Sequence, residues 1–345
     1  MFNIALILLV SAEFCFYLLI AQTGIVEYFH SDLAIIGFLP VGAVLGTIGS
    51  LFVDFRYKFH LLIFIQALLM LFYPNLNSFM LFIMGMSMGA VSVMIIEILK
   101  RASREDMMVA LMLSYTIGTL LFNSEIEGRW IVGLVFSLIV FISAFFISFK
   151  PHVGVSFMGT LGQPQGIAPT NWLKFFKQNT LQHSIWLMFI WVFLDSTLFE
   201  SLSRNLAISI WRDGYTLEIA LFHIIGVAVA IKFSLNTMKQ QLIIATSFAL
   251  SYMLYIANEP LLLSIIYPFV ISFYNVVILQ TLIKENSFIK LSLYMILIGW
   301  GASGMGLLFA LNHWVAPLFA LIFAMGIYSL KDSIKFKQRS QYGLA

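Results

Sequence analysis

Two carboxyl groups lie deep inside long apolar runs of this sequence. Glu13 is in the run 2–21 and Asp195 is in the run 184–202. If both runs are helices, each carboxyl lies about 16 Å from the start of its run, at about 1.5 Å per residue. An ionisable group at that depth of a membrane costs several kcal/mol, so it indicates function by default. The pair predicts proton binding or cation recognition; the alternative is that each carboxyl is hydrogen-bonded and holds helices together.

Aromatic and small polar residues in similar runs are candidates to line a binding cavity. Aromatic faces can hold organic cations, and a histidine can relay protons near neutral pH. Ordinary packing between helices explains the same residues without a ligand. Glu200 needs no such role, because Arg204 follows four residues later and an ion pair at that spacing explains both. The candidates are Tyr17, Ser87, Trp191, His223, Tyr267, Tyr274 and Asn275.

A methionine stripe offers a second, different chemistry. Met80, Met84 and Met88 are spaced four residues apart in the run 78–99, so a helix places them on one face. Thioethers are ligands for soft Cu(I), which makes a copper pathway one interpretation. The other is that methionine fills irregular core space.

The elements that must position these residues are membrane-spanning helices. The chain has 345 residues, of which 61% are hydrophobic and 10% charged. Its apolar runs are long enough to cross a hydrocarbon core of about 30 Å, and only helices satisfy their own backbone groups there. We expect about twelve spans, at 2–21, 33–53, 60–73, 78–99, 107–122, 129–149, 184–202, 216–235, 240–257, 260–282, 288–311 and 313–330.

Basic residues set the predicted orientation. If the N-terminus is cytoplasmic, only Arg129, Arg204 and Arg212 among the 19 Lys and Arg residues fall on the outer side. Lysine and arginine concentrate on the cytoplasmic side of membrane proteins. The distribution therefore predicts an even number of spans with both termini inside.

One long connection divides the chain. Residues 150–183 contain a Gly-, Pro- and Gln-rich stretch followed by an amphipathic one, which we expect to lie on the inner membrane surface. The predicted fold is an all-α membrane protein with two pseudo-symmetric six-helix bundles, at 1–149 and 184–330, and a cytoplasmic tail at 331–345. Parallel repeats of this kind are a transporter architecture.

The plan resembles the major facilitator superfamily. That family carries a signature loop, roughly G-x-L-x-D-R-x-G-R-R, between its second and third spans, and residues 49–58 read GSLFVDFRYK. The resemblance implies that Asp54 caps a helix of the other half in one state of the transporter. It also implies a conformational charge network made of Asp54, Arg56, Lys58, Glu97, Arg101 and Arg104.

The sequence predicts a secondary active transporter that moves a small organic solute by alternating access with proton coupling. No Lys or Arg lies at mid-depth in a predicted span, which favours a cationic or neutral solute. The alternatives are a soft-metal transporter and a scaffold that transports nothing.

Other classes are not expected. The sequence shows no nucleophile–base set, metal-ligand spacing or phosphate-binding loop, so we expect neither an enzyme nor a cofactor. The expected partners are the solute, protons and the lipid bilayer, without nucleic acid, for a monomer in a bacterial inner membrane.

Overall fold

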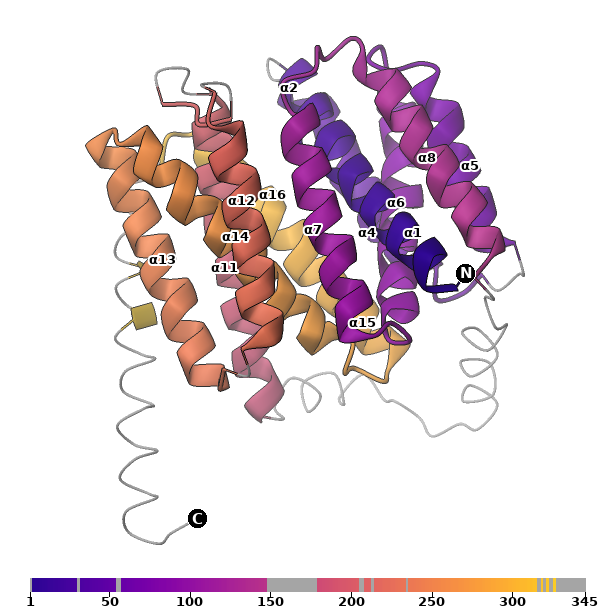
Figure 1. Cartoon of the computed structure of the whole chain (residues 1–345). Helices are drawn as coiled ribbons and strands as arrows, with labels where there is room; N and C mark the ends of the chain where they lie inside the picture. The colour runs from indigo at the N-terminus through magenta and orange to yellow at the C-terminus, as the bar shows by residue number, and fades with distance from the viewer. Residues whose placement is uncertain are drawn as a thin grey trace, which may run out of the picture. The chain divides into compact units, whose positions relative to one another are not determined.

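The structure is a computed structural model that describes residues 2–29, 32–53, 57–147, 179–204, 208–211, 214–233 and 235–314, with short pieces at 318, 321–322 and 325–326. Every regular element in these ranges is a helix, which confirms the all-α class (Figure 1). Six helices in the described part are long and apolar enough to cross a membrane: Asn3–Tyr28, Ser78–Leu99, Ser184–Ser203, Thr237–Ala257, Pro260–Leu282 and Phe288–Leu311. Three shorter apolar helices are Ala34–Gly49, Lys58–Met70 and Arg129–Phe145.

The predicted spans from 2–21 to 288–311 each coincide with a helix, although the ends differ. The first is longer than predicted, because α1 (Phe2–Phe16) continues through a π-helix, η1 (Tyr17–Ile25), into α2 (Val26–Tyr28). The second is divided into α3 (Leu33–Ile36) and α4 (Phe38–Gly49). Most of the predicted span 313–330, the amphipathic stretch within 150–183 and the tail 331–345 lie outside the described residues.

The chain forms two compact units. The first contains residues 1–190 and 279–302, and the second contains residues 191–278 and 303–345. The division into bundles at 1–149 and 184–330 stays a prediction.

Reciprocal glycines join two helices of the first unit. Gly46 of α4 lies against Met86 of α6 (Ser78–Leu99), where an added Cβ would be 2.6 Å from the Met86 Cα. In return, Gly89 of α6 lies against Ala43 of α4, where a Cβ would be 2.6 Å from its carbonyl carbon. Thr47 also donates a hydrogen bond to the Gly89 carbonyl oxygen at 3.0 Å. These two backbones therefore approach more closely than any larger residue would permit.

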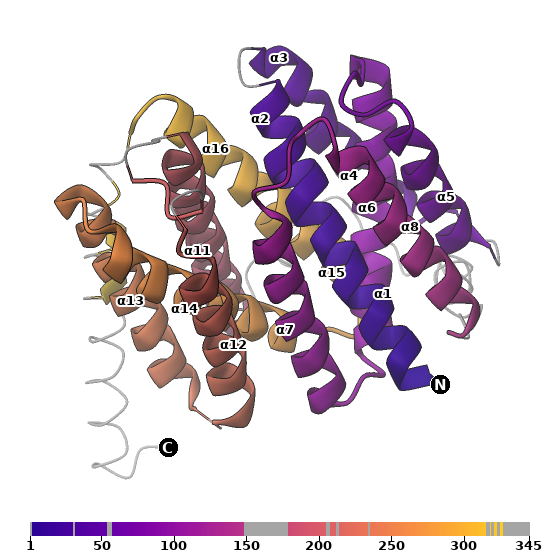
Figure 2. The same ribbon diagram turned by 45° about the horizontal axis from the view of Figure 1, so that its top comes forward.

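Helix α1 packs on α7 (Arg104–Leu121) and α8 (Arg129–Phe145) (Figure 2). Ser11 donates to the Ala110 carbonyl at 2.9 Å, and Cys15 donates to the Ser114 carbonyl at 3.2 Å. Both pairs are separated by 99 residues, so α1 and α7 run parallel with matched levels. Helix α5 (Lys58–Met70) packs on α6 and α8.

The second unit contains most of α11 (Asn179–Arg204), together with α12 (Thr216–Lys232), α13 (Thr237–Ala257) and much of α14 (Pro260–Leu282). Helix α16 (Ser303–Leu311) packs against α11, because an added Cβ on Gly306 would be 2.6 Å from the Ser196 Cβ. Helix α15 (Phe288–Tyr294) and the π-helix η2 (Met295–Ala302) belong to the first unit.

Short polar residues begin several helices. Asn77 accepts a hydrogen bond from the Met80 amide at 2.9 Å at the start of α6. Ser103 and Asp106 form a reciprocal capping box at the start of α7. These side chains satisfy backbone amides that the first helical turn leaves without partners. They allow the helices to begin directly after short loops.

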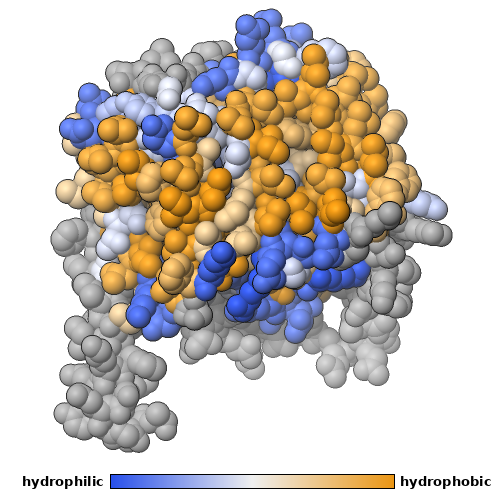
Figure 3. Space-filling model, in the orientation of Figure 1, coloured by the Kyte–Doolittle hydropathy of each residue, from blue (hydrophilic) through white to orange (hydrophobic). Residues whose placement is uncertain are grey.

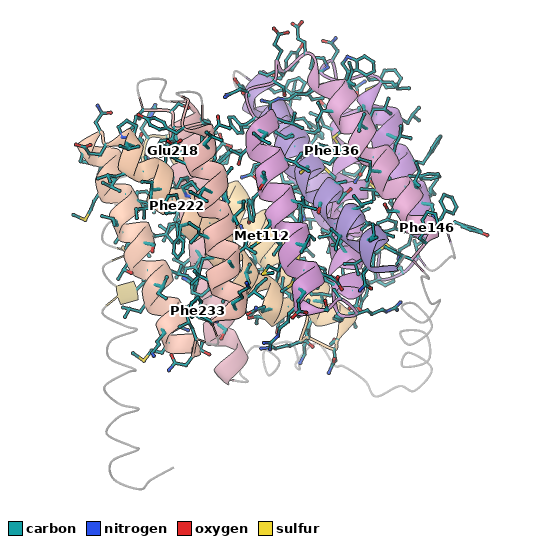
Figure 4. The ribbon with its side chains drawn as sticks, viewed as in Figure 1. Met112, Phe136, Phe146, Glu218, Phe222 and Phe233 are labelled. Carbon is teal, nitrogen blue, oxygen red and sulfur yellow. The ribbon has the colours of Figure 1, made fainter. Side chains whose placement is uncertain are left out.

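The sides of the helices expose many large apolar side chains. Phe79 is 71% exposed and Phe146, at the end of α8, is 57% exposed (Figure 4). Apolar residues cover the middle of the visible helices, whereas hydrophilic residues gather near their ends (Figure 3). An apolar surface of this extent requires a lipid environment. The chain is therefore an integral membrane protein.

Candidate functional site

Asp195 lies inside the second unit with both carboxyl oxygens hydrogen-bonded. Its side chain is 7% exposed. The Tyr274 hydroxyl donates to Oδ2 at 2.7 Å, and the Tyr267 hydroxyl donates to Oδ1 at 2.9 Å. The Tyr267 hydroxyl also lies 2.9 Å from the Asp195 backbone carbonyl. Because the tyrosines are seven residues apart in α14, they lie on one face of the helix and meet the carboxyl together.

Further aromatic side chains enclose this group. The Tyr252 hydroxyl of α13 donates to the Leu194 carbonyl at 2.7 Å, next to Asp195. The Trp211 ring meets the Tyr267 ring at 6.4 Å between centroids. Tyr252 and Trp211 were not among the candidates from the sequence, since nothing in their local spacing relates them to α11. We call Asp195, Tyr267 and Tyr274 the carboxyl–tyrosine cluster.

His223 supports the cluster from α12. Its side chain is 3% exposed and hydrogen-bonds the backbone of Pro268. Its ring stacks on the Trp211 ring, with 6.3 Å between the two centroids. Ser272 also donates to the Pro268 carbonyl at 2.9 Å. Pro268 follows Tyr267 directly, so His223 is anchored beside the cluster.

Glu13 occupies a different environment in the first unit. Its side chain is 5% exposed, and its Oε1 accepts a hydrogen bond of 3.1 Å from Gln66 Nε2 of α5. Gln66 is fully buried. It was not a candidate from the sequence, although it is a lone amide among the apolar residues in the middle of its span. Glu13 and Asp195 belong to different units, and the proton or cation binding predicted for the pair stays a prediction.

Arg129 is a buried cation whose depth the sequence did not indicate. The sequence places it at the outer end of the predicted span 129–149, yet its side chain is 2% exposed. Nη1 donates to Thr23 Oγ1 at 2.9 Å and to the Leu19 carbonyl at 3.2 Å, both in η1. Nη2 donates to the Phe122 carbonyl at 2.6 Å. The guanidinium therefore joins the end of α7 to the π-helical part of the first span.

The remaining cavity candidates lie two in each unit. The Tyr17 and Trp300 rings meet edge to face within the first unit, with 6.0 Å between their centroids. Ser87 donates to the Leu62 carbonyl at 2.7 Å, which links α6 to α5. Trp191 is buried in the second unit, and Asn275 is half-buried in α14.

The methionine stripe lies mainly in the interior. Met84 and Met88 are buried, and Met80 is half-buried. Within the described ranges, no group of three His, Cys, Asp or Glu side chains is arranged to hold a metal ion.

The structure describes four of the six residues of the predicted charge network, Lys58, Glu97, Arg101 and Arg104. Lys58 donates to the Ser50 and Val53 carbonyls at 2.8 Å each, which satisfies backbone groups after α4. Glu97 forms a salt bridge with Lys100, a residue outside the predicted set. Arg101 and Arg104 are exposed. Asp54, Arg56 and the side chain of Arg204 lie outside the described residues.

The fold defines a class of protein: an α-helical integral membrane protein with buried carboxyl groups inside its helical units. No protein-family model matches the sequence, and no curated protein matches it. The structure is similar to the crystal structure of the human organic anion transporter MFSD10 (TETRAN), with a TM-score of 0.58 and 15% identity. The similarity covers 95% of this chain and 96% of that one. The chain therefore has the fold of a major facilitator superfamily transporter, as the sequence resemblance predicted.

Proposed function

We propose that this protein is a secondary active transporter that moves a small organic solute by alternating access, coupled to protons. The observation that supports it most is a transporter fold shared over nearly the whole chain, with the carboxyl–tyrosine cluster in its second unit. In this proposal the chain crosses the membrane about twelve times, in two six-helix bundles that rock around a central binding site.

Asp195 is the proposed coupling residue. As a carboxylate it accepts two phenolic hydrogen bonds, which are charge-assisted and strong. When the carboxyl takes up a proton, Tyr267 retains an acceptor, because its hydroxyl already lies 2.9 Å from the Asp195 backbone carbonyl. The cluster can therefore change protonation state while its polar groups stay hydrogen-bonded, as a coupling site requires.

A cationic or neutral solute is the proposed substrate class. MFSD10 carries organic anions according to its description, but an identity of 15% relates the folds and not the substrates. In this chain ionised Asp195 supplies negative charge within a span, whereas Arg129 is engaged with oxygens of Thr23, Leu19 and Phe122. Solutes without net negative charge avoid repulsion from this carboxylate.

The proposed setting is a bacterial inner membrane with both termini cytoplasmic. The Lys and Arg residues support this orientation, because with twelve spans and a cytoplasmic N-terminus all but Arg129, Arg204 and Arg212 fall on the cytoplasmic side. The orientation is tested with single cysteines introduced into a Cys15→Ala background. Their reaction with an impermeant thiol reagent is measured on whole cells.

Transport in proteoliposomes tests the function. The purified full chain is reconstituted with a pH gradient, and uptake of tetraphenylphosphonium, a lipophilic cation, is measured together with proton movement by a trapped pH-sensitive dye. Gradient-driven accumulation is expected for the native chain and not for Asp195→Asn. Exchange of labelled for unlabelled solute persists in the variant, because exchange needs no net proton movement. Full accumulation by Asp195→Asn would remove the coupling role.

Phenylalanine substitutions test the cluster itself. Each hydrogen bond to a charged group contributes about 1.5–3 kcal/mol, so Tyr274→Phe changes the proton concentration for half-maximal transport by about 10- to 150-fold. Tyr252→Phe is the matched control, since Tyr252 is equally buried but donates to a backbone carbonyl. An equal effect of the two substitutions would show that the Asp195 hydrogen bonds have no special role.

A further inference from the structure

Two facing side chains in the first unit leave two buried oxygens without hydrogen-bond partners. Glu13 and Gln66 share one hydrogen bond, from Nε2 to Oε1. Glu13 Oε2 and Gln66 Oε1 are buried and have no partner within the described residues. Each unmet buried polar atom costs about 1–3 kcal/mol, so this arrangement requires an explanation.

Both unmet atoms are acceptors when Glu13 is ionised. Rotating the Gln66 amide does not help, because its carbonyl oxygen would then face a carboxylate oxygen, and two acceptors do not form a hydrogen bond. A proton on Glu13 Oε2 converts that atom into a donor. One proton can therefore satisfy both unmet oxygens, in a ring closed by two hydrogen bonds.

The surroundings of Glu13 and Gln66 also favour the protonated form of Glu13. Glu13 is 5% exposed and Gln66 is fully buried, so an ionised carboxyl there would be a charge in a nonpolar interior. Such a charge is costly unless a cation pairs with it. Gln66 is the only hydrogen-bond partner of the Glu13 carboxyl within the described chain.

The other ionisable groups on neighbouring elements are Cys15 on α1, Tyr17 on η1, Lys58 and His60 on α5, Arg104, Glu105, Asp106 and Tyr115 on α7, and Arg129 on α8. Cys15 and Tyr17 lie within about one helical turn of Glu13, whereas the basic groups lie at different levels. His60 and Lys58 precede Gln66 by about 9 and 12 Å along α5, at about 1.5 Å per residue. Arg129 contacts Leu19, about 9 Å beyond Glu13 along the first span on the same scale. None of these groups forms a salt bridge with Glu13 in the described structure.

We propose that Glu13 and Gln66 form a proton-binding site between α1 and α5, in which protonated Glu13 donates to Gln66 Oε1 while Gln66 Nε2 donates to Glu13 Oε1. The only bond formed is the O–H bond at Oε2. The site belongs to the first unit alone, so it does not depend on Asp195 or on the transported solute. Binding the proton joins α1 to α5 by two hydrogen bonds, and losing it leaves one.

Infrared spectroscopy of the full chain tests the site directly. Difference spectra between acidic and alkaline samples are recorded in the region of the carboxylic acid C=O stretch, in ordinary and heavy water. The expected result is a band from a protonated, hydrogen-bonded glutamic acid that moves in heavy water and disappears in Glu13→Gln. An unchanged spectrum in Glu13→Gln would overturn the proposal.

A second substitution keeps the test decisive if Glu13→Gln does not fold. Gln66→Leu retains the acid but removes both amide contacts, so the same band should move to higher frequency, as for an acid without hydrogen bonds. A band unaffected by Gln66→Leu would show that Gln66 is not the partner. Asp195→Asn is the control, which should leave the band in place while abolishing gradient-driven transport. Failure of the proton site and failure of the coupling proposal are thus seen in separate measurements.

Discussion

Gly46 is the position at which one added methyl group has the clearest expected effect on stability. In Gly46→Ala the new Cβ would lie 2.6 Å from both the Cα and the carbonyl carbon of Met86. These are backbone atoms of α6, so no side-chain rotation relieves the contact, and the two helices must separate. Gly49, three residues later in the same helix, has no atom within 4 Å of an added Cβ in the described structure. Gly49→Ala is therefore the matched control.

The expected loss of stability is the difference between the Gly46→Ala and Gly49→Ala variants. Overpacking by a methyl group costs about 1–3 kcal/mol, with values near or above the upper end where only backbone can move. Alanine is favoured over glycine in a helix by up to about 1 kcal/mol, and this gain applies to both substitutions. We expect Gly46→Ala to be less stable than Gly49→Ala by about 1–3 kcal/mol, which corresponds to about 1–4 °C in Tm for a chain of 345 residues.

The chain supplies its own reporter for this measurement. Cys15 is the sole cysteine, and it is buried in α1 of the same unit. A dye that fluoresces on reaction with a thiol therefore reports unfolding when detergent-purified protein is heated. Equal melting temperatures for Gly46→Ala and Gly49→Ala would refute the close packing of α4 on α6.

Three further predictions concern single positions, and the same melting assay measures them. Gly306→Ala should lower Tm, because its Cβ meets the backbone of α11, whereas Gly304→Ala, with no atom within 4 Å in the described structure, should not. Ser103→Ala removes the capping box with Asp106 and should cost about 1 kcal/mol, with recovery in Ser103→Thr. Arg129→Met should destabilise by about 1–3 kcal/mol, because it removes the donor to the buried Phe122 carbonyl, and a variant of native stability would contradict the role of this buried cation.

Local sequence properties explain which predictions the structure confirms. The run 78–99 coincides with α6 from its first residue to its last, because apolar length determines a span and Asn77 supplies the cap that begins it. Glu13 and Asp195 lie in long apolar helices, as their positions predicted. The π-helices η1 and η2 were not predicted, since apolar composition does not distinguish an α-helix from a π-helix.

The partners of the buried polar groups were decided by tertiary structure. Tyr267 and Tyr274 were candidates as residues of one helix, but their contact with Asp195 spans 72 and 79 positions of sequence. Gln66 meets Glu13 from 53 positions away, and Arg129 meets Leu19 from 110. Helical periodicity gives the face on which a residue lies, but it does not give the helix that packs there.

The sequence alone therefore determined that the chain is helical and spans a membrane, because apolar length and charge are properties of each segment taken separately. Only the packing of the helices decided which donors each buried carboxyl receives. That choice depends on distances between segments far apart in the chain, and it makes Asp195 a hydrogen-bonded carboxyl with two donors while leaving Glu13 with one.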